Sequence, residues 1–195
     1  DSKVIGVQNS IDQFFYEDNG KKYMFWGSFR GIYATELTDN GLEIKKKTDG
    51  TPVLKKRICG NRFEGTNIYK RGEYYYLFAS IGTCCNGATS TYQTVVGRSK
   101  NVLGPYLDKT GRDMLYDYCE IIMSGNETWA GPGHNSILIQ DDVGTDWIIY
   151  HGYKKKEAEN GRYVLMDKLI WSNDGWPSVK SNAPSILEVA PYFQK

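Results

Sequence analysis

Residues 10–16 (SIDQFFY), 22–28 (KYMFWGS) and 31–37 (GIYATEL) decide the fold of this chain. Each run is short and rich in aromatic or β-branched residues, and residues 18–20 (DNG) form a turn signal between the first two. Short runs of this kind, separated by tight turns, predict three strands joined in an antiparallel meander.

The same layout returns twice further along the chain. The second copy comprises residues 63–69, 74–80 and 92–99, and the third comprises residues 133–139, 147–151 and 162–169. Repeats of about 50 to 70 residues, each a short meander, are typical of propeller blades around a central channel. We therefore expect an all-β propeller, with a β-sandwich as the alternative.

The blade-like repeats span about residues 10–58, 62–110 and 131–190, within a single domain of residues 1–195. Residues 45–56 and 111–126 hold turn residues and charges that suit outer strands and connecting loops.

Composition narrows the classes of partner. The chain has 195 residues, 40% of them hydrophobic and 24% charged, and its 15 Tyr, 5 Trp and 21 Gly are typical of an all-β globular protein. The net charge of +1 provides no basic face for a phosphate backbone, so we expect no nucleic acid partner. No apolar run approaches the roughly 20 residues needed to span a bilayer, so we expect no membrane partner.

The four cysteines, Cys59, Cys84, Cys85 and Cys119, do not have the spacing of zinc ligands. The adjacent Cys84 and Cys85 leave two alternatives open. They form a vicinal disulfide that stiffens a loop, or they remain two reduced, partly buried thiols.

Three polar residues occupy equivalent places in the three repeats. Asp12, Glu64 and His134 each lie near the start of a first strand, which is commonly the innermost strand of a blade. We therefore expect them to converge on one site at the propeller axis. In the alternative interpretation, each residue merely caps a strand or satisfies a buried backbone group.

Two neighbouring carboxyl groups favour general acid chemistry. Ionising both is unfavourable in a low dielectric, so one of them stays protonated near neutral pH. A protonated carboxyl group can donate a proton to a glycosidic oxygen as the bond breaks, and aromatic side chains offer faces for sugars. The chain has no Gly-rich phosphate loop, nucleophile elbow or zinc-binding His motif. Glycoside hydrolysis is therefore the chemistry that fits best.

At these residues the sequence resembles the family 43 glycoside hydrolases, which are five-bladed arabinanases, arabinofuranosidases and β-xylosidases. The resemblance covers nearly the whole chain, through residues 10–12, 20–23, 26–28, 64–65, 74–80, 84–87, 90–92, 96–99, 104–106, 131–136, 150–151, 161–162 and 174–177. Each piece is weak by itself, but together and in this order they are specific. Residues 84–87 (CCNG) and 90–92 (STY) look most like the arabinan-acting branch.

The resemblance implies a five-bladed propeller of which this chain supplies about three C-terminal blades. It implies an inverting hydrolase of arabinose- or xylose-containing plant polysaccharides or oligosaccharides, above all at α-L-arabinofuranosyl linkages. Glu64 would be the general acid, and Asp12 would orient Glu64 and raise its pKa, while water attacks from the opposite face.

Further roles follow from the same resemblance. His134 looks like an axial histidine that helps to hold a hydrated calcium ion in the channel. Arg162 matches an arginine near the sugar-binding subsite, with a structural salt bridge as the alternative. Trp26, Ser28 and Tyr92 are also assigned to substrate binding, and for Tyr92 loop scaffolding is the favoured alternative.

The general base of the family is an Asp in the first blade, and the resemblance implies that this chain starts at the third. Either the missing N-terminal blades lie in a segment outside these residues, which we favour, or the chain by itself is inactive. The family resemblance implies a secreted or periplasmic protein. Two competing functions remain, namely a carbohydrate-binding propeller without catalysis and a protein-interaction propeller in which the channel carboxylates are incidental.

Overall fold

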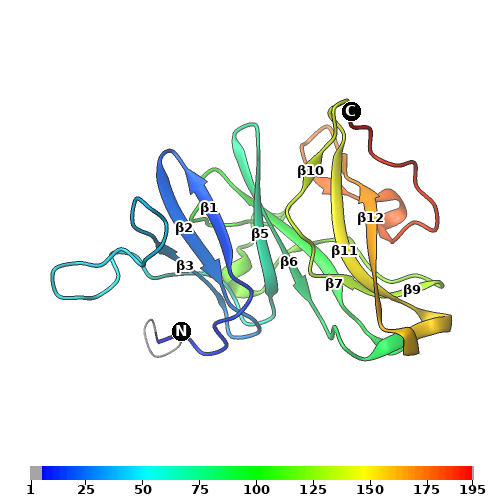
Figure 1. Cartoon of the computed structure of the whole chain (residues 1–195), viewed down its shortest axis with the longest axis horizontal. Coiled ribbons are helices and arrows are strands. Elements are labelled where there is room, and N and C mark those ends of the chain that lie inside the picture. The colour runs from blue at the N-terminus through cyan, green and yellow to red at the C-terminus, as the bar shows by residue number, and fades with distance from the viewer. Residues whose placement is uncertain (1–5, 195) are drawn as a thin grey trace. The chain divides into compact units, whose positions relative to one another are not determined.

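The structure is a computed structural model that describes residues 6–194. Its first sheet is antiparallel and has four strands in the order of the chain (Figure 1), namely β1 (Phe14–Asp18), β2 (Lys21–Trp26), β3 (Ile32–Glu36) and β4 (Lys56–Cys59). Asn19 and Gly20 connect β1 to β2 with positive φ angles of 50° and 74°, as the tightest hairpin turns require. The predicted meander is confirmed. Residues 45–55, where an outer strand or a loop was expected, form turns with an isolated bridge, and the outer strand β4 begins only at Lys56.

The second sheet has the same layout. Its strands follow in the order β5 (Glu64–Arg71), β6 (Tyr74–Ile81), β7 (Gln93–Ser99) and β8 (Glu120–Met123). Strand β8 is the outer strand predicted within residues 111–126. Short 3-10 helices interrupt the loops, namely η1 (Gly87–Thr89), η2 (Met114–Tyr116), η3 (Lys155–Asn160) and η4 (Lys180–Asn182).

The third sheet departs from the prediction. It contains β9 (Trp129–Gly133), β10 (Ile139–Gln140), β11 (Asp146–Lys154) and β12 (Arg162–Lys168), and a separate pair follows, β13 (Ile170–Trp171) with β14 (Pro177–Ser178). The expected first strand at residues 133–139 is broken, because β9 and β10 pair with different parts of β11. His134 follows β9 with a φ of 51°, a left-handed conformation that no extended strand contains.

Two compact units divide the chain. The first comprises Asp1–Phe78 and Val96–Glu120, and the second comprises Ala79–Val95 and Ile121–Lys195. Strands β6, β7 and β8 continue from one unit into the other. The fully buried side chains of the first unit include Phe25, Trp26, Phe63 and Tyr106, and those of the second include Tyr92, Met123 and Trp147. The fold is all-β, and the prediction of a single domain stays a prediction.

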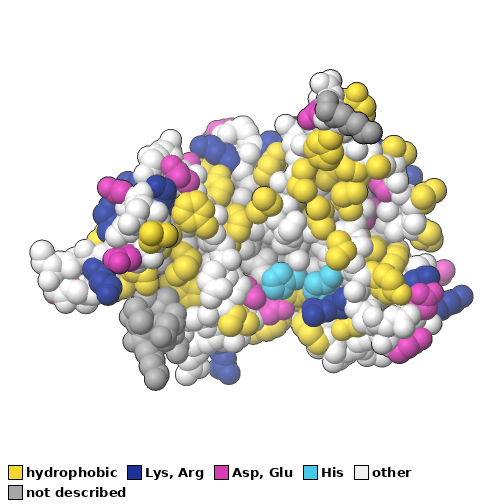
Figure 2. Space-filling model, in the orientation of Figure 1, with side chains coloured by type: hydrophobic (Ala, Val, Ile, Leu, Met, Phe, Trp, Pro, Cys, Tyr) yellow, Lys and Arg dark blue, Asp and Glu magenta, His cyan; other side chains and the backbone are white. Residues whose placement is uncertain are grey.

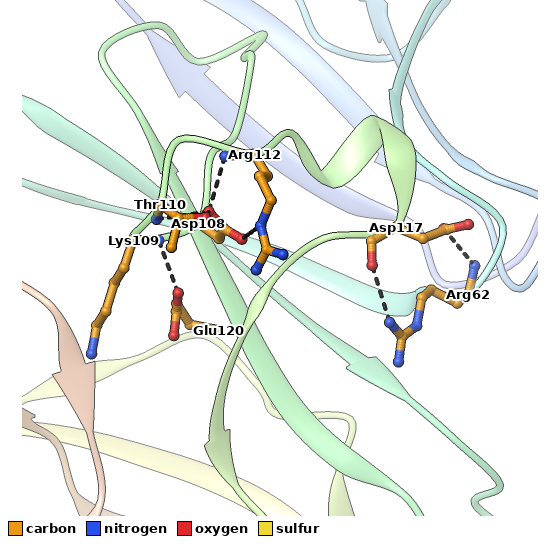
Figure 3. Close-up of polar contacts among 7 residues, drawn as sticks. All are labelled: Arg62, Asp108, Lys109, Thr110, Arg112, Asp117 and Glu120. Atoms are coloured by element: carbon orange, nitrogen blue, oxygen red, sulfur yellow. Dashed lines mark hydrogen bonds and ion pairs between the residues drawn. The ribbon is translucent and has the colours of Figure 1, made fainter.

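In the first unit, a turn built around Asp108 shapes the connection between β7 and β8 (Figure 3). The buried Asp108 carboxylate accepts hydrogen bonds from the Thr110 amide and hydroxyl, both at 2.8 Å, and from the Arg112 amide at 2.9 Å and Nε at 2.8 Å. Burial opposes ionisation of Asp108, but the bonds from Arg112 and Thr110 outweigh it and lower the pKa of this carboxyl. Further along the connection, Asp117 accepts from the amide of Arg62 at 3.3 Å and thereby holds the approach to β5.

Among the described residues, no helix has the length and apolar character that crossing a membrane requires.

Candidate active site

Glu64 is the first residue of β5, and its side chain is buried with 7% of the residue exposed. Its Oε2 atom accepts a hydrogen bond of 2.6 Å from the hydroxyl of Ser28, which is itself 2% exposed. A hydrogen bond between two buried side chains meets little competition from water and restricts both of them. The predicted general acid therefore has a defined orientation within the first compact unit.

Ser28 lies in the turn after β2, and the backbone of this turn is anchored on both sides. The Gly27 amide donates to the carbonyl of Ile11 at 2.9 Å, and the Phe29 amide donates to the carbonyl of Phe63 at 2.9 Å. Gly27 has a φ of 128°, and an added Cβ would lie 2.1 Å from the carbonyl oxygen of Gly31. Only glycine fits there, so the sequence at this turn determines where the Ser28 hydroxyl points.

Asp12 precedes β1, is half-buried and has a φ of 58°. Ile11, which precedes Asp12, accepts a backbone hydrogen bond from Gly27. Phe63, which precedes Glu64, accepts one from Phe29. One turn therefore holds the segments of both predicted catalytic residues. This arrangement agrees with the expectation that Asp12 and Glu64 share a site, and the assigned role of Asp12 stays a prediction.

Three of the four residues assigned to substrate binding are buried. Trp26, Ser28 and Tyr92 are 1%, 2% and 1% exposed, respectively. Trp26 packs against Val7 and stacks on Tyr33 with the ring centroids 6.0 Å apart. Each of these three side chains is therefore almost closed to solvent in this chain. Arg162 is the one of the four whose side chain is exposed.

In the second unit, three side chains gather around the imidazole of His151 on β11. The ring of Tyr92 is stacked on His151 at 5.8 Å between centroids, and the ring of His134 is stacked on it at 6.3 Å. Arg162 on β12 places its NH1 atom 3.3 Å from Nε2 of His151. Figure 2 shows the two histidine side chains next to each other, with a basic side chain beside them. This unit therefore brings together the predicted residues Tyr92, His134 and Arg162.

His151 is the residue of this cluster that the sequence analysis did not assign to the site. Burial, the charge of Arg162 and the proximity of His134 together lower the pKa of His151 from 6.5 to about 4. Its imidazole is therefore neutral at ordinary pH. The sequence did contain a signal that could have identified His151. It is one of only 2 His in the chain, and it ends the apolar run 147–151 (WIIYH).

Close backbone packing explains how the cluster is positioned. An added Cβ at Gly133 would lie 2.4 Å from the Tyr92 ring, so this ring rests directly on the backbone of β9. The amide of His134 donates to the Ser80 hydroxyl at 2.7 Å, which anchors the left-handed residue. A side chain at Gly133 would displace Tyr92 from His151, because the ring has no room to move toward the sheet.

Cys84 and Cys85 are joined by a disulfide, one of the two alternatives that the sequence left open. In the same loop, Ser90 accepts a hydrogen bond from the Asn86 amide at 3.0 Å and donates one to the Cys84 carbonyl at 3.3 Å. The loop that precedes β7 is thus internally cross-linked, which supports the scaffolding interpretation for Tyr92.

The surroundings of His134 do not by themselves fit a calcium ion. Calcium prefers six to eight oxygen ligands, whereas the ring of His134 stacks on another imidazole, that of His151. Within residues 6–194, no group of three or more His, Cys, Asp or Glu side chains is arranged to hold a metal ion. The calcium contact of His134 stays a prediction, and no chemical step below depends on it.

The comparisons with known proteins identify the family of the chain. A model of Glycosyl hydrolases family 43 matches residues 2–177. An extracellular exo-α-(1→5)-L-arabinofuranosidase of Cellvibrio japonicus is 36% identical over 88% of this chain and 52% of that protein. An extracellular endo-α-(1→5)-L-arabinanase of Bacillus subtilis is 35% identical over 87% of this chain and 50% of that protein. The chain spans about half the length of the curated relatives it matches.

Solved structures show the same likeness. An α-L-arabinanase from Cellvibrio cellulosa, in complex with arabinohexaose, matches with a TM-score of 0.72 and 34% identity over 87% of this chain and 56% of that chain. An exo-1,5-α-L-arabinanase from a bovine ruminal metagenomic library matches with a TM-score of 0.76 and 35% identity over 89% of this chain and 58% of that chain.

Proposed function

Because this chain belongs to glycosyl hydrolase family 43, we propose that it is part of an inverting glycoside hydrolase that cleaves α-L-arabinofuranosyl linkages in plant polysaccharides or oligosaccharides. The observation that carries this proposal is the buried Glu64 carboxyl group, oriented by Ser28 on the turn that also holds the segment of Asp12. Arabinose is favoured over xylose because the similar enzymes described above are named for arabinan or arabinose.

The Ser28 contact assigns different tasks to the two oxygens of Glu64. Since the Ser28 hydroxyl donates to Oε2, the acidic proton of the neutral carboxyl group belongs on Oε1. Glu64 Oε1 would then donate this proton to the leaving glycosidic oxygen as the bond to the anomeric carbon breaks. A water molecule would attack from the opposite face of the sugar and yield the inverted anomer.

The attacking water requires a general base about 6.5 to 9.5 Å from the acid. We propose that residues outside this chain supply the base, on blades that precede residue 1. This idea is supported by the two curated relatives, because the chain covers only about half of the length of each. The three larger sheets would be three blades of a five-bladed propeller within one domain, and the missing blades of the same protein would be its partner.

Two further proposals concern the surroundings of the reaction. The exposed Arg162 would contact the sugar, while Trp26, Ser28 and Tyr92 would act from buried positions. The protein would act outside the cytoplasm, either secreted or periplasmic, because the two relatives described above are named extracellular.

The decisive experiment uses a preparation that carries this chain together with the proposed N-terminal blades. We expect sugar release from linear arabinan and from nitrophenyl arabinofuranoside, and proton NMR should show the inverted anomer first. Glu64→Gln should lower kcat on arabinan by roughly 100- to 10,000-fold, the range typical of a general acid. The loss should be smaller on the nitrophenyl substrate, because its leaving group needs less protonation.

Glu73→Gln is the matched control, because Glu73 is an exposed partner of Lys100 at 2.8 Å in the same unit and should leave activity unchanged. A wild-type preparation that releases no sugar, or a Glu64→Gln variant with full activity, would overturn the hydrolase proposal. Sugar-dependent stabilisation without hydrolysis would instead support the carbohydrate-binding propeller. The absence of both would support a protein-interaction propeller.

A further inference from the structure

The imidazole of His151 is held on β11 by contacts with several elements of the second unit. Tyr92 at the entrance to β7 is nearly parallel to it, with an angle of 17° between the ring planes. His134, which follows β9, stacks on it with an angle of 28°. Two stacked rings leave the imidazole little freedom to rotate, so the direction of its nitrogen atoms is set by the fold.

The contact with Arg162 determines the tautomer of His151. A guanidinium group can only donate hydrogen bonds, so Nε2 of His151 must accept over the 3.3 Å from NH1 of Arg162. The imidazole is then neutral with its proton on Nδ1, and this atom is buried without a hydrogen-bond partner. The low pKa of His151 agrees with this assignment, because burial, Arg162 and His134 all disfavour the charged ring.

A neutral partner leaves the charge of Arg162 intact. Among the described residues, Arg162 forms no ion pair, and its contact with a side chain is the one with His151. A carboxylate partner would both orient and neutralise the guanidinium, whereas an imidazole orients it and leaves the other N–H donors available. Arg162 is exposed at the same time, so these donors can reach a ligand.

We propose that His151 is a positioning residue, whose imidazole, stacked on Tyr92, holds the guanidinium of Arg162 in the direction of a sugar hydroxyl. The inference rests on the proposed function, because it deepens the account of the same site. It assigns no contact with substrate to His151 itself. The effect of His151 on binding therefore passes through Arg162.

Two substitutions separate positioning from packing. His151→Phe keeps a flat ring for Tyr92 but removes the acceptor, whereas His151→Gln loses the ring but retains an amide oxygen near the place of Nε2. With arabinan as substrate, we expect His151→Phe to lower kcat/KM roughly 10- to 100-fold, mainly through KM, as the loss of a hydrogen bond to a charged group does. We expect His151→Gln to stay within about fivefold of the wild type.

A double variant tests whether the effect passes through Arg162. In an Arg162→Met background, His151→Phe should cause no further fall in kcat/KM, because the two residues act as one unit. A merely structural role predicts the opposite order, with His151→Phe tolerated and His151→Gln damaging, and that order would overturn the proposal. Additive effects of His151→Phe and Arg162→Met would overturn it as well.

An NMR measurement of the imidazole keeps this test independent of the hydrolase proposal. The nitrogen shifts of wild-type His151 should report the neutral form with the proton on Nδ1, and Arg162→Met should change the shift of Nε2, because the hydrogen bond that this atom accepts is lost. If the wild type hydrolyses no pentoside but these shifts are found, the proposed function fails while the arrangement of His151 and Arg162 stands. An Nε2 shift that is the same in the wild type and in Arg162→Met would overturn the inference even in an active enzyme.

Discussion

The Ser28 hydroxyl donates a hydrogen bond of 2.6 Å to Oε2 of Glu64, although 36 residues separate the two in the sequence. The donor lies in the turn after β2 and the acceptor starts β5, so the contact joins the first sheet to the second within one compact unit. This hydrogen bond also has a chemical consequence. Because the Ser28 hydroxyl donates to Oε2, the proton that the proposed reaction transfers belongs on Oε1 of Glu64.

Ser28→Ala should therefore reduce activity without unfolding the protein. Loss of a hydrogen bond to a charged or reacting group costs about 1.5–3 kcal/mol, which corresponds to a fall in kcat/KM of roughly 10- to 100-fold. Ser99→Ala is the control, because Ser99 is also buried but its hydroxyl accepts from the Asn101 amide. Equal kinetics of both variants with arabinan would show that the Ser28 contact has no catalytic role.

Gly27→Ala should destabilise the first unit strongly. The added Cβ would lie 2.1 Å from a backbone oxygen that cannot easily move, so we expect a loss of about 3 kcal/mol or more in urea unfolding. Gly20→Ala is the matched control, since Gly20 also has a positive φ, of 74°, but nothing within 4 Å of the added atom. That variant should lose only about 1 kcal/mol. Similar losses of stability in Gly27→Ala and Gly20→Ala would mean that the turn at Gly27 has room for a Cβ atom.

Asp108→Asn should also reduce stability, by roughly 2–4 kcal/mol, because an amide cannot accept all the hydrogen bonds that the carboxylate accepts. The folded-state pKa of Asp108 lies below 3.8, so its stabilisation is present above pH 3.8 and is lost as pH falls through the folded-state pKa. Unfolding midpoints between pH 6 and 2 would show this loss in the wild type and a weaker one in Asp108→Asn. Asp49→Asn, in an exposed turn, should change stability little.

The pH dependence of stability should also report His151. Its pKa is about 4 in the folded chain and 6.5 as the ordinary value, so the unfolded chain binds more protons between these values. The free energy of unfolding is therefore expected to fall as pH decreases from about 6.5 to about 4. His151→Phe should lack this contribution and show a flatter profile over that window. Parallel profiles of the two proteins would indicate that the folded-state pKa of His151 is not depressed.

Local patterns were sufficient for much of the fold. The aromatic-rich run of residues 22–28 and the DNG turn predicted β2 and its hairpin, and the apolar run 147–151 lies within β11. These elements depend on residue type and turn chemistry, which neighbouring residues determine. The repeat of such patterns also indicated the equivalent places of Asp12, Glu64 and His134.

Long-range packing decided the rest. The break of the third meander at His134, the burial of Trp26 and Tyr92, and the Ser28–Glu64 hydrogen bond all depend on residues that are distant in sequence. The role proposed for His151 depends on a ring stacked on one side and a guanidinium on the neighbouring strand. Residue types and their order specify which strands form, because those preferences are local. Which side chains meet is decided only when the sheets pack, because burial and hydrogen-bond partners are properties of the folded chain.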